Sequence, residues 1–232
     1  MTRFVAFVAA LTIISLVATL ASAAEEKASA PESFSVASVH LEQNATDHDV
    51  EAVIEIIGGD NGLTTLTVVA PNGQNIVDVK APVGGTLGMR QFHFETPEPK
   101  DTESLEKAFP EGVYVITGTT ADGKTLSDKS TLSHKLPKPT TITRPKADAK
   151  NVDPHHLEIT WSPVKDAASY TIEVEGDGGA DLTAKLPKSV TKFAVPDGFL
   201  QPGADCQVGI GTVSADGNVS VVEVEFTAAG KK

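Results

Sequence analysis

The 232-residue chain carries 31 acidic and 19 basic residues, which gives a net charge of −12, and it has one cysteine, Cys206. This acidic balance excludes a surface built to bind nucleic acid or anionic lipid, because both ligands repel negative charge. A single cysteine excludes an internal disulfide, and the length allows one or two domains.

Residues 1–23 predict a secretory signal peptide. Arg3 is followed by an apolar run and then by an Ala-x-Ala sequence that suits cleavage. We therefore expect an exported protein, periplasmic or secreted, with no stable membrane insertion after cleavage. The apolar stretch from Phe4 to Ala24 is also long enough to span a bilayer, which leaves an uncleaved N-terminal anchor as the alternative. Residues 24–33 are predicted to be a flexible lead-in.

Alternating apolar and polar residues predict antiparallel β-strands along most of the chain, each with one face toward a core and one toward solvent. The alternating sets are Ile54/Ile56, Val77/Val79, Phe92/Phe94, Leu157/Ile159/Trp161, Tyr170/Ile172/Val174 and Val222/Val224/Phe226. Turn residues separate the strands at Pro71–Gly73, Ala121–Gly123 and Ala215–Asn218. The predicted helix, Asp101–Phe109, ends before Pro110.

Two similar hairpins indicate two domains. The turns at Asp122-Gly123 and Asp216-Gly217 lie 94 residues apart, close to the length of one immunoglobulin-sized domain. We expect a first β-sandwich over residues 34–136 and a second over residues 139–228. The segment 137–145 is predicted to be a stiff joint because it is rich in proline.

Three features of the second half follow the pattern of a known family. Trp161 matches a core tryptophan of the second strand, Tyr170 matches an aromatic residue of the third, and Leu200-Gln-Pro-Gly203 matches a Leu-x-Pro-Gly corner before the sixth. Residues 139–228 thus resemble a fibronectin type III domain. The predicted fold class is all-β, with two tandem immunoglobulin-like/fibronectin type III β-sandwiches after an N-terminal signal peptide.

The whole chain also resembles exported bacterial proteins that pair an immunoglobulin-like N-terminal half with this module. The stretches that carry this resemblance are GMRQFHFETPEP and FPEGVYVITGTTADGKTLSDKSTLSH. It implies an architecture and no activity.

Cys206 stands where the fibronectin type III family has a tyrosine, whose hydroxyl bonds to the upstream backbone. Tyr114, in FPEGVY, has the equivalent place in the first half. Cys206 alternates in phase with Val208 and Ile210, so we expect a buried, inert thiol. An intermolecular disulfide or a redox-sensing thiol is the alternative, although neither neighbour in sequence is cationic.

Neither histidine cluster, Asp47-His48-Asp49 or His155-His156, has the ligand spacing of a zinc site. The Asp/Gly-rich loops are predicted to be turns, and among them Asp177 with Asp181 is the best candidate for calcium. We expect no metal and no cofactor, and we assign no catalytic, cofactor-binding or metal-binding residue.

Paired carboxylates occur along two predicted strands, as Glu173/Glu175 and Glu223/Glu225. They are predicted to lie on a wet face as solubilising charge, because a catalytic pair would need a cleft to raise one pKa. The sequence has no Gly-x-Ser-x-Gly elbow. We therefore expect no enzyme activity.

The sequence favours a non-catalytic exported binding or scaffold protein that presents two β-sandwich modules to a protein or cell-envelope partner. The alternatives are a calcium- or saccharide-binding module that uses the Asp/Gly-rich loops, and an accessory subunit of an envelope enzyme system.

Two stretches, Asn44-Ala-Thr46 and Asn218-Val-Ser220, fit the N-glycosylation sequon. They would matter only in a eukaryotic secretory route.

Overall fold

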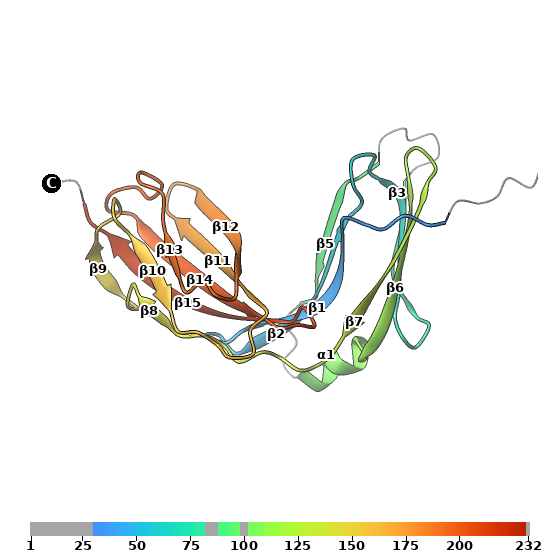
Figure 1. Cartoon of the computed structure of the whole chain (residues 1–232), viewed down its shortest axis with the longest axis horizontal. Coiled ribbons are helices and arrows are strands. Elements are labelled where there is room, and N and C mark those ends of the chain that lie inside the picture. Colours follow the sequence, from blue (N-terminus) through green and yellow to red (C-terminus); the bar gives the residue numbers. More distant parts are fainter. Residues whose placement is uncertain (1–29, 82–87, 98–101, 231–232) are drawn as a thin grey trace, which may run out of the picture. The chain divides into compact units, whose positions relative to one another are not determined.

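The computed structural model describes residues 30–81, 88–97 and 102–230, which in these ranges form fifteen strands and one short helix (Figure 1). The predicted signal peptide (1–23) and the lead-in as far as residue 29 lie outside them. The residues from Pro31 onward form one compact unit. Among the described residues, no helix is long and apolar enough to cross a membrane.

The first β-sandwich packs a three-stranded layer, β1-β2-β5, against a four-stranded sheet, β4-β3-β6-β7. Its elements are β1 (Val36–Asn44), β2 (Asp49–Ile57), β3 (Leu63–Val69), β4 (Asn75–Lys80), β5 (Gln91–Glu95), α1 (Thr102–Ala108), β6 (Gly112–Thr120) and β7 (Thr125–Leu132). Val39 and Ile56 from one layer and Leu66 and Ile116 from the other are fully buried in one core. Burying such side chains stabilises the fold by about 1.5–3 kcal/mol each.

The second β-sandwich repeats this arrangement, with the sheet β13-β10-β8 facing the layer β12-β11-β14-β15. Its strands are β8 (Ile142–Arg144), β9 (Ala149–Val152), β10 (Glu158–Trp161), β11 (Ser169–Gly176), β12 (Ala180–Pro187), β13 (Lys192–Ala194), β14 (Asp205–Val213) and β15 (Val219–Ala228). Apart from β9, the strands of the two sandwiches correspond one to one in chain order and sheet position. The chain is therefore a tandem of two all-β sandwiches, as predicted.

The alternating patterns and turn signals are confirmed as strands and turns. Every predicted apolar set lies on a strand except for Leu157, which comes directly before β10. The helix is confirmed over Thr102–Ala108, with Asp101 outside the described residues. Trp161 and Tyr170 are buried in the second core, with their rings edge to face and the centroids 5.7 Å apart. The domain boundaries stay a prediction, and β8 falls inside the predicted joint.

One strand pairing joins the two sandwiches. β1 pairs in parallel with β15, with Glu42 opposite Val219 and Asn44 opposite Val221. This pairing makes one eight-stranded sheet, called here the shared sheet. Seven of its strands follow the order β12-β11-β14-β15-β1-β2-β5, and the eighth, β9, pairs in parallel with β15 outside that order. The periodicity predicted antiparallel strands in two separate sandwiches, so this β1–β15 contact, called the seam, is a new feature.

Register at the seam places both cores on the same side of the shared sheet. Partners across a ladder point to the same face, and Gln43 is the partner of Ser220. Leu41, two residues from Gln43, lies in the first core, and Val222, two residues from Ser220, packs on the second. The opposite face, called the outer face, therefore runs across both sandwiches.

Candidate binding surface

Carboxylates from β11 and β15 gather on the outer face around the middle of β14. Strand register aligns two rows there, Glu173–Gly209–Glu223 and Glu175–Gln207–Glu225. These residues except Glu225 line a shallow hollow of about 100 Å³. Gly209 has no side chain, so the floor between Glu173 and Glu223 stays open. The prediction that the paired glutamates share one face is confirmed.

The concentration of negative charge changes the ionisation of Glu173. Its side chain is exposed, yet partial desolvation, followed by the charges of Glu175, Asp181, Glu223 and Glu42, raises its pKa above the ordinary value. Each cause disfavours the ionised carboxylate. A cation placed on this face would relieve that repulsion.

The acidic surface continues across the seam into the first sandwich. Glu42 lies on β1 opposite Val219, and its charge acts on Glu173. Asn44, also on β1, donates a hydrogen bond from Nδ2 to Glu223 Oε2 at 3.0 Å. Residues of both sandwiches therefore contribute to one charged face.

The outer face is concave. Lys185 Nζ on β12 lies 3.9 Å from Glu55 Oε2 on β2. Strands about 4.8 Å apart would place β12 and β2 about 24 Å from each other in a flat sheet, farther than these two side chains can span. Val53, also on the outer side of β2, is only 1% exposed. The shared sheet therefore curves toward its outer face.

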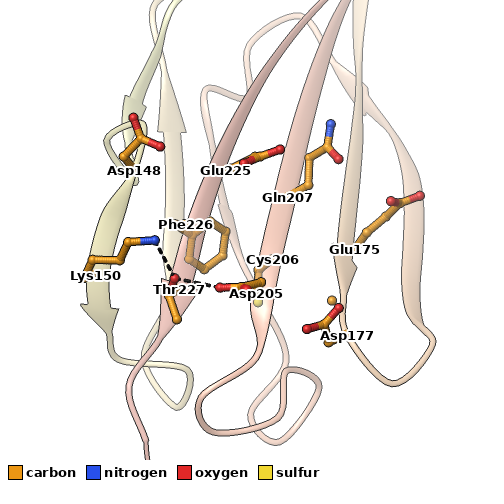
Figure 2. A pocket seen from close by; sticks show the side chains of 11 residues that line it. Asp148, Lys150, Glu175, Asp177, Asp205, Cys206, Gln207, Glu225, Phe226 and Thr227 are labelled. Carbon is orange, nitrogen blue, oxygen red and sulfur yellow. Dashed lines mark hydrogen bonds between the residues drawn. The ribbon is translucent and has the colours of Figure 1, made fainter.

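A larger hollow of about 380 Å³ lies at one end of this face, where β9, β11, β14 and β15 meet (Figure 2). Its charged lining consists of Asp148, Lys150, Glu175, Asp177, Asp205 and Glu225. Lys150 Nζ donates to Thr227 Oγ1 at 2.9 Å, and Thr227 Oγ1 donates to Asp205 Oδ1 at 2.8 Å. The hollow thus extends the excess of carboxylates to the end of the sheet.

Cys206 lies at the back of this hollow, and its predicted inward orientation is confirmed. It is 4% exposed, and Val208 and Ile210 are fully buried in the same core. Burial raises the pKa of its thiol, and the charges of Asp177 and Asp205 add to that rise. Because the thiolate is the reactive form, this environment favours an inert side chain.

The two adjacent histidines do not converge. His155 Nδ1 lies 2.6 Å from Asp197 Oδ1, whereas His156 Nδ1 lies 3.0 Å from Asp153 Oδ2. The bond to Asp153, and then its charge, raises the pKa of His156. Within the described ranges, no three His, Cys, Asp or Glu side chains group as metal ligands.

Asp177 and Asp181, the candidate calcium ligands, do not line a common site. Asp177 lines the larger hollow, whereas Asp181 lies on β12 opposite Glu175 and is not part of its lining. Asn218, read as a turn and sequon residue, is fully buried, as is Ser220. Sequence reasoning missed both as structural residues of the seam, because turn chemistry alone explains an Asp-Gly-Asn stretch.

No protein-family model matches the chain, and comparison with curated proteins gives no match. Among solved structures, the chain is similar to the fibronectin(III)-like modules of Clostridium thermocellum CbhA. The identity is 11%, the match covers 84% of this chain and 92% of that one, and the TM-score is 0.35.

It is also similar to a two-domain fibronectin type III segment of chicken tenascin, at 15% identity, with 85% of this chain and 99% of that one covered and a TM-score of 0.32. A third similar structure is that of the FN1–FN3 domains of chicken CNTN1. The identity is 11%, the match covers 86% of this chain and 66% of that one, and the TM-score is 0.33. At such identities and TM-scores, no partner or activity can be transferred to this chain. The sandwich architecture is instead defined by the chain's own sheets and cores.

Proposed function

We propose that this chain is an exported, non-catalytic binding protein, and that the outer face binds a protein segment rich in lysine and arginine. Export is inferred from residues 1–23. The observation that carries the binding proposal is the sheet that continues through the seam, because it gives both sandwiches one concave face with clustered carboxylates.

Charge complementarity selects the partner. Glu173, Glu175 and Glu223 surround an open floor whose lining includes no cationic side chain. A cationic segment would neutralise these carboxylates, and such complementarity increases association rates and excludes acidic partners. Nucleic acid and anionic lipid surfaces are therefore not partners of this face.

The test is fluorescence anisotropy with a labelled peptide of alternating lysine and serine, compared with alternating glutamate and serine. We expect the lysine peptide to bind, and its affinity to fall as salt screens the charges. Replacing Glu173, Glu175 and Glu223 together with glutamine should weaken binding by about tenfold or more.

The matched control is the triple variant Glu103→Gln, Glu106→Gln and Asp166→Asn, which removes three exposed carboxylates elsewhere and leaves the same net charge. We expect its affinity to change by less than about twofold. An equal loss in both triple variants would show that net charge alone attracts the peptide, and would contradict the proposal. Calcium binding that is lost only in the first triple variant would identify the face as a cation site instead.

A further inference from the structure

Asn218 belongs to the second sandwich by sequence, but its side chain points into the seam. It ends the Ala215–Asn218 turn that leads into β15, and it is fully buried. A buried amide needs partners for both its oxygen and its nitrogen. All the hydrogen-bond partners of the Asn218 side chain lie outside the second sandwich.

The amide of Asn218 connects three segments. Its Oδ1 accepts a hydrogen bond from Leu41 N on β1 at 2.9 Å. Its Nδ2 donates to Ser133 O at 2.8 Å and to Lys135 O at 3.1 Å, both in the segment that follows β7. The side chain thereby extends the β1–β15 ladder, whose first backbone partners are Glu42 and Val219.

A second buried side chain repeats the arrangement two residues later. Ser220 is fully buried, and its Oγ donates to Pro137 O at 2.8 Å. Next to it, Ala45 N donates to Val221 O at 2.8 Å. Side-chain and backbone bonds thus alternate along the seam, and each ties β15 to a segment that precedes the second sandwich.

We infer that Asn218 and Ser220 form a polar lock that fixes the second sandwich against the first, with Asn218 as its central residue. Hydrogen bonds are directional, so one amide that donates twice and accepts once admits a single arrangement of its three partners. Truncation of Asn218 would leave Leu41 N, Ser133 O and Lys135 O without this partner. The seam would then open to let water satisfy them.

This lock requires no ligand, so it is tested without one. Spin labels are attached at Asn72→Cys in the first sandwich and at Ser189→Cys in the second, both exposed positions, in a Cys206→Ala background. Pulsed electron paramagnetic resonance then measures the distance between the two labels. We expect one narrow distance distribution. Asn218→Ala should broaden it, whereas Asn61→Ala, which truncates an exposed amide bonded to Asp122, should leave it unchanged.

Folding is monitored through Trp161, the chain's one tryptophan, which lies in the second core. A broad distribution before mutation, or a narrow one in folded Asn218→Ala, would overturn the inference. If Asn218→Ala does not fold, Ser220→Ala decides the question. Broadening in that variant supports the lock, and an unchanged narrow distribution contradicts it. Because peptide binding is not the readout, these results are independent of the proposed function.

Discussion

The hydroxyl of Tyr114 donates a hydrogen bond to the carbonyl oxygen of Pro110 at 2.9 Å. This is the tyrosine corner that the sequence predicted for the first sandwich. Cys206 follows Pro202 by the same four residues on the corresponding strand of the second sandwich. Its thiol has only a weak contact, 3.5 Å from Ala204 O. The second sandwich therefore folds without this corner bond.

We expect Tyr114→Phe to lower the free energy of unfolding by about 0.5–1.5 kcal/mol, the net contribution of one such hydrogen bond. The ring stays in place, so the loss reports the hydroxyl alone. Urea denaturation at pH 7 measures it. An unchanged midpoint would show that the bond contributes nothing to stability.

Alkaline pH provides a control on this prediction. Burial raises the pKa of Tyr114 to about 12, above its ordinary value of 10.0. The neutral phenol therefore contributes stability that is fully present below about pH 10 and is lost as the pH rises toward 12. The stability difference between wild type and Tyr114→Phe should shrink over this interval.

Cys206 should resist thiol reagents while the protein is folded. Its burial and raised pKa both reduce the thiolate that a disulfide reagent can reach. We expect labelling by Ellman's reagent at least about 100-fold slower than labelling of Ser189→Cys, an exposed site, in a Cys206→Ala background. The two rates should converge in urea. Rapid labelling of the native protein would mean that the thiol is accessible.

The glycines of β14 should differ sharply in their tolerance of a methyl group. A Cβ at Gly211 would overlap Thr171 Oγ1 and lie 2.9 Å from Val219 Cγ1, so Gly211→Ala should cost about 1–3 kcal/mol. A Cβ at Gly209 would lie 3.5 Å from its nearest neighbour, an ordinary contact. We expect Gly209→Ala to be neutral or to stabilise by up to about 1 kcal/mol. Equal effects in thermal unfolding would contradict the packing described here.

Glu173→Gln should stabilise the protein at neutral pH. The raised pKa of Glu173 means that folding disfavours the ionised carboxylate. The stability that its protonated form contributes is therefore fully present below the ordinary pKa of 4.5 and is lost as the pH rises above it. Because the side chain is exposed, we expect a gain below about 1 kcal/mol at pH 7. The gain should vanish at pH 4. Asp166→Asn, an exposed carboxylate elsewhere, should give no comparable gain.

Local features of the fold were predictable, and long-range ones were not. Alternation around Glu55 or Glu173 shows which side of a strand is buried, because the side-chain period is two. It carries no information on which strand lies alongside. Glu42 and Val219 are 177 residues apart, and nothing in either stretch specifies a parallel pairing. For the same reason, the sequence indicated a wet acidic face but not its continuation across two sandwiches.

Asn218 illustrates a second limit. Asparagine is a common residue in an Asp-Gly-Asn turn, so the sequence gives no reason to expect a further role for it. Its buried hydrogen bonds become visible only when the fold brings Leu41 and Ser133 beside it. The different partners of His155 and His156, Asp197 and Asp153, likewise become visible only in the folded chain.

The most direct test of the proposed binding surface is a titration of isotope-labelled protein with the lysine–serine peptide, followed by amide chemical shifts. We expect shifts at Glu173, Gln207 and Glu223 in the second sandwich and at Glu42 in the first, with the β4-β3-β6-β7 sheet unaffected. Shifts confined to one sandwich, or spread over that four-stranded sheet, would contradict a single outer face as the site of binding.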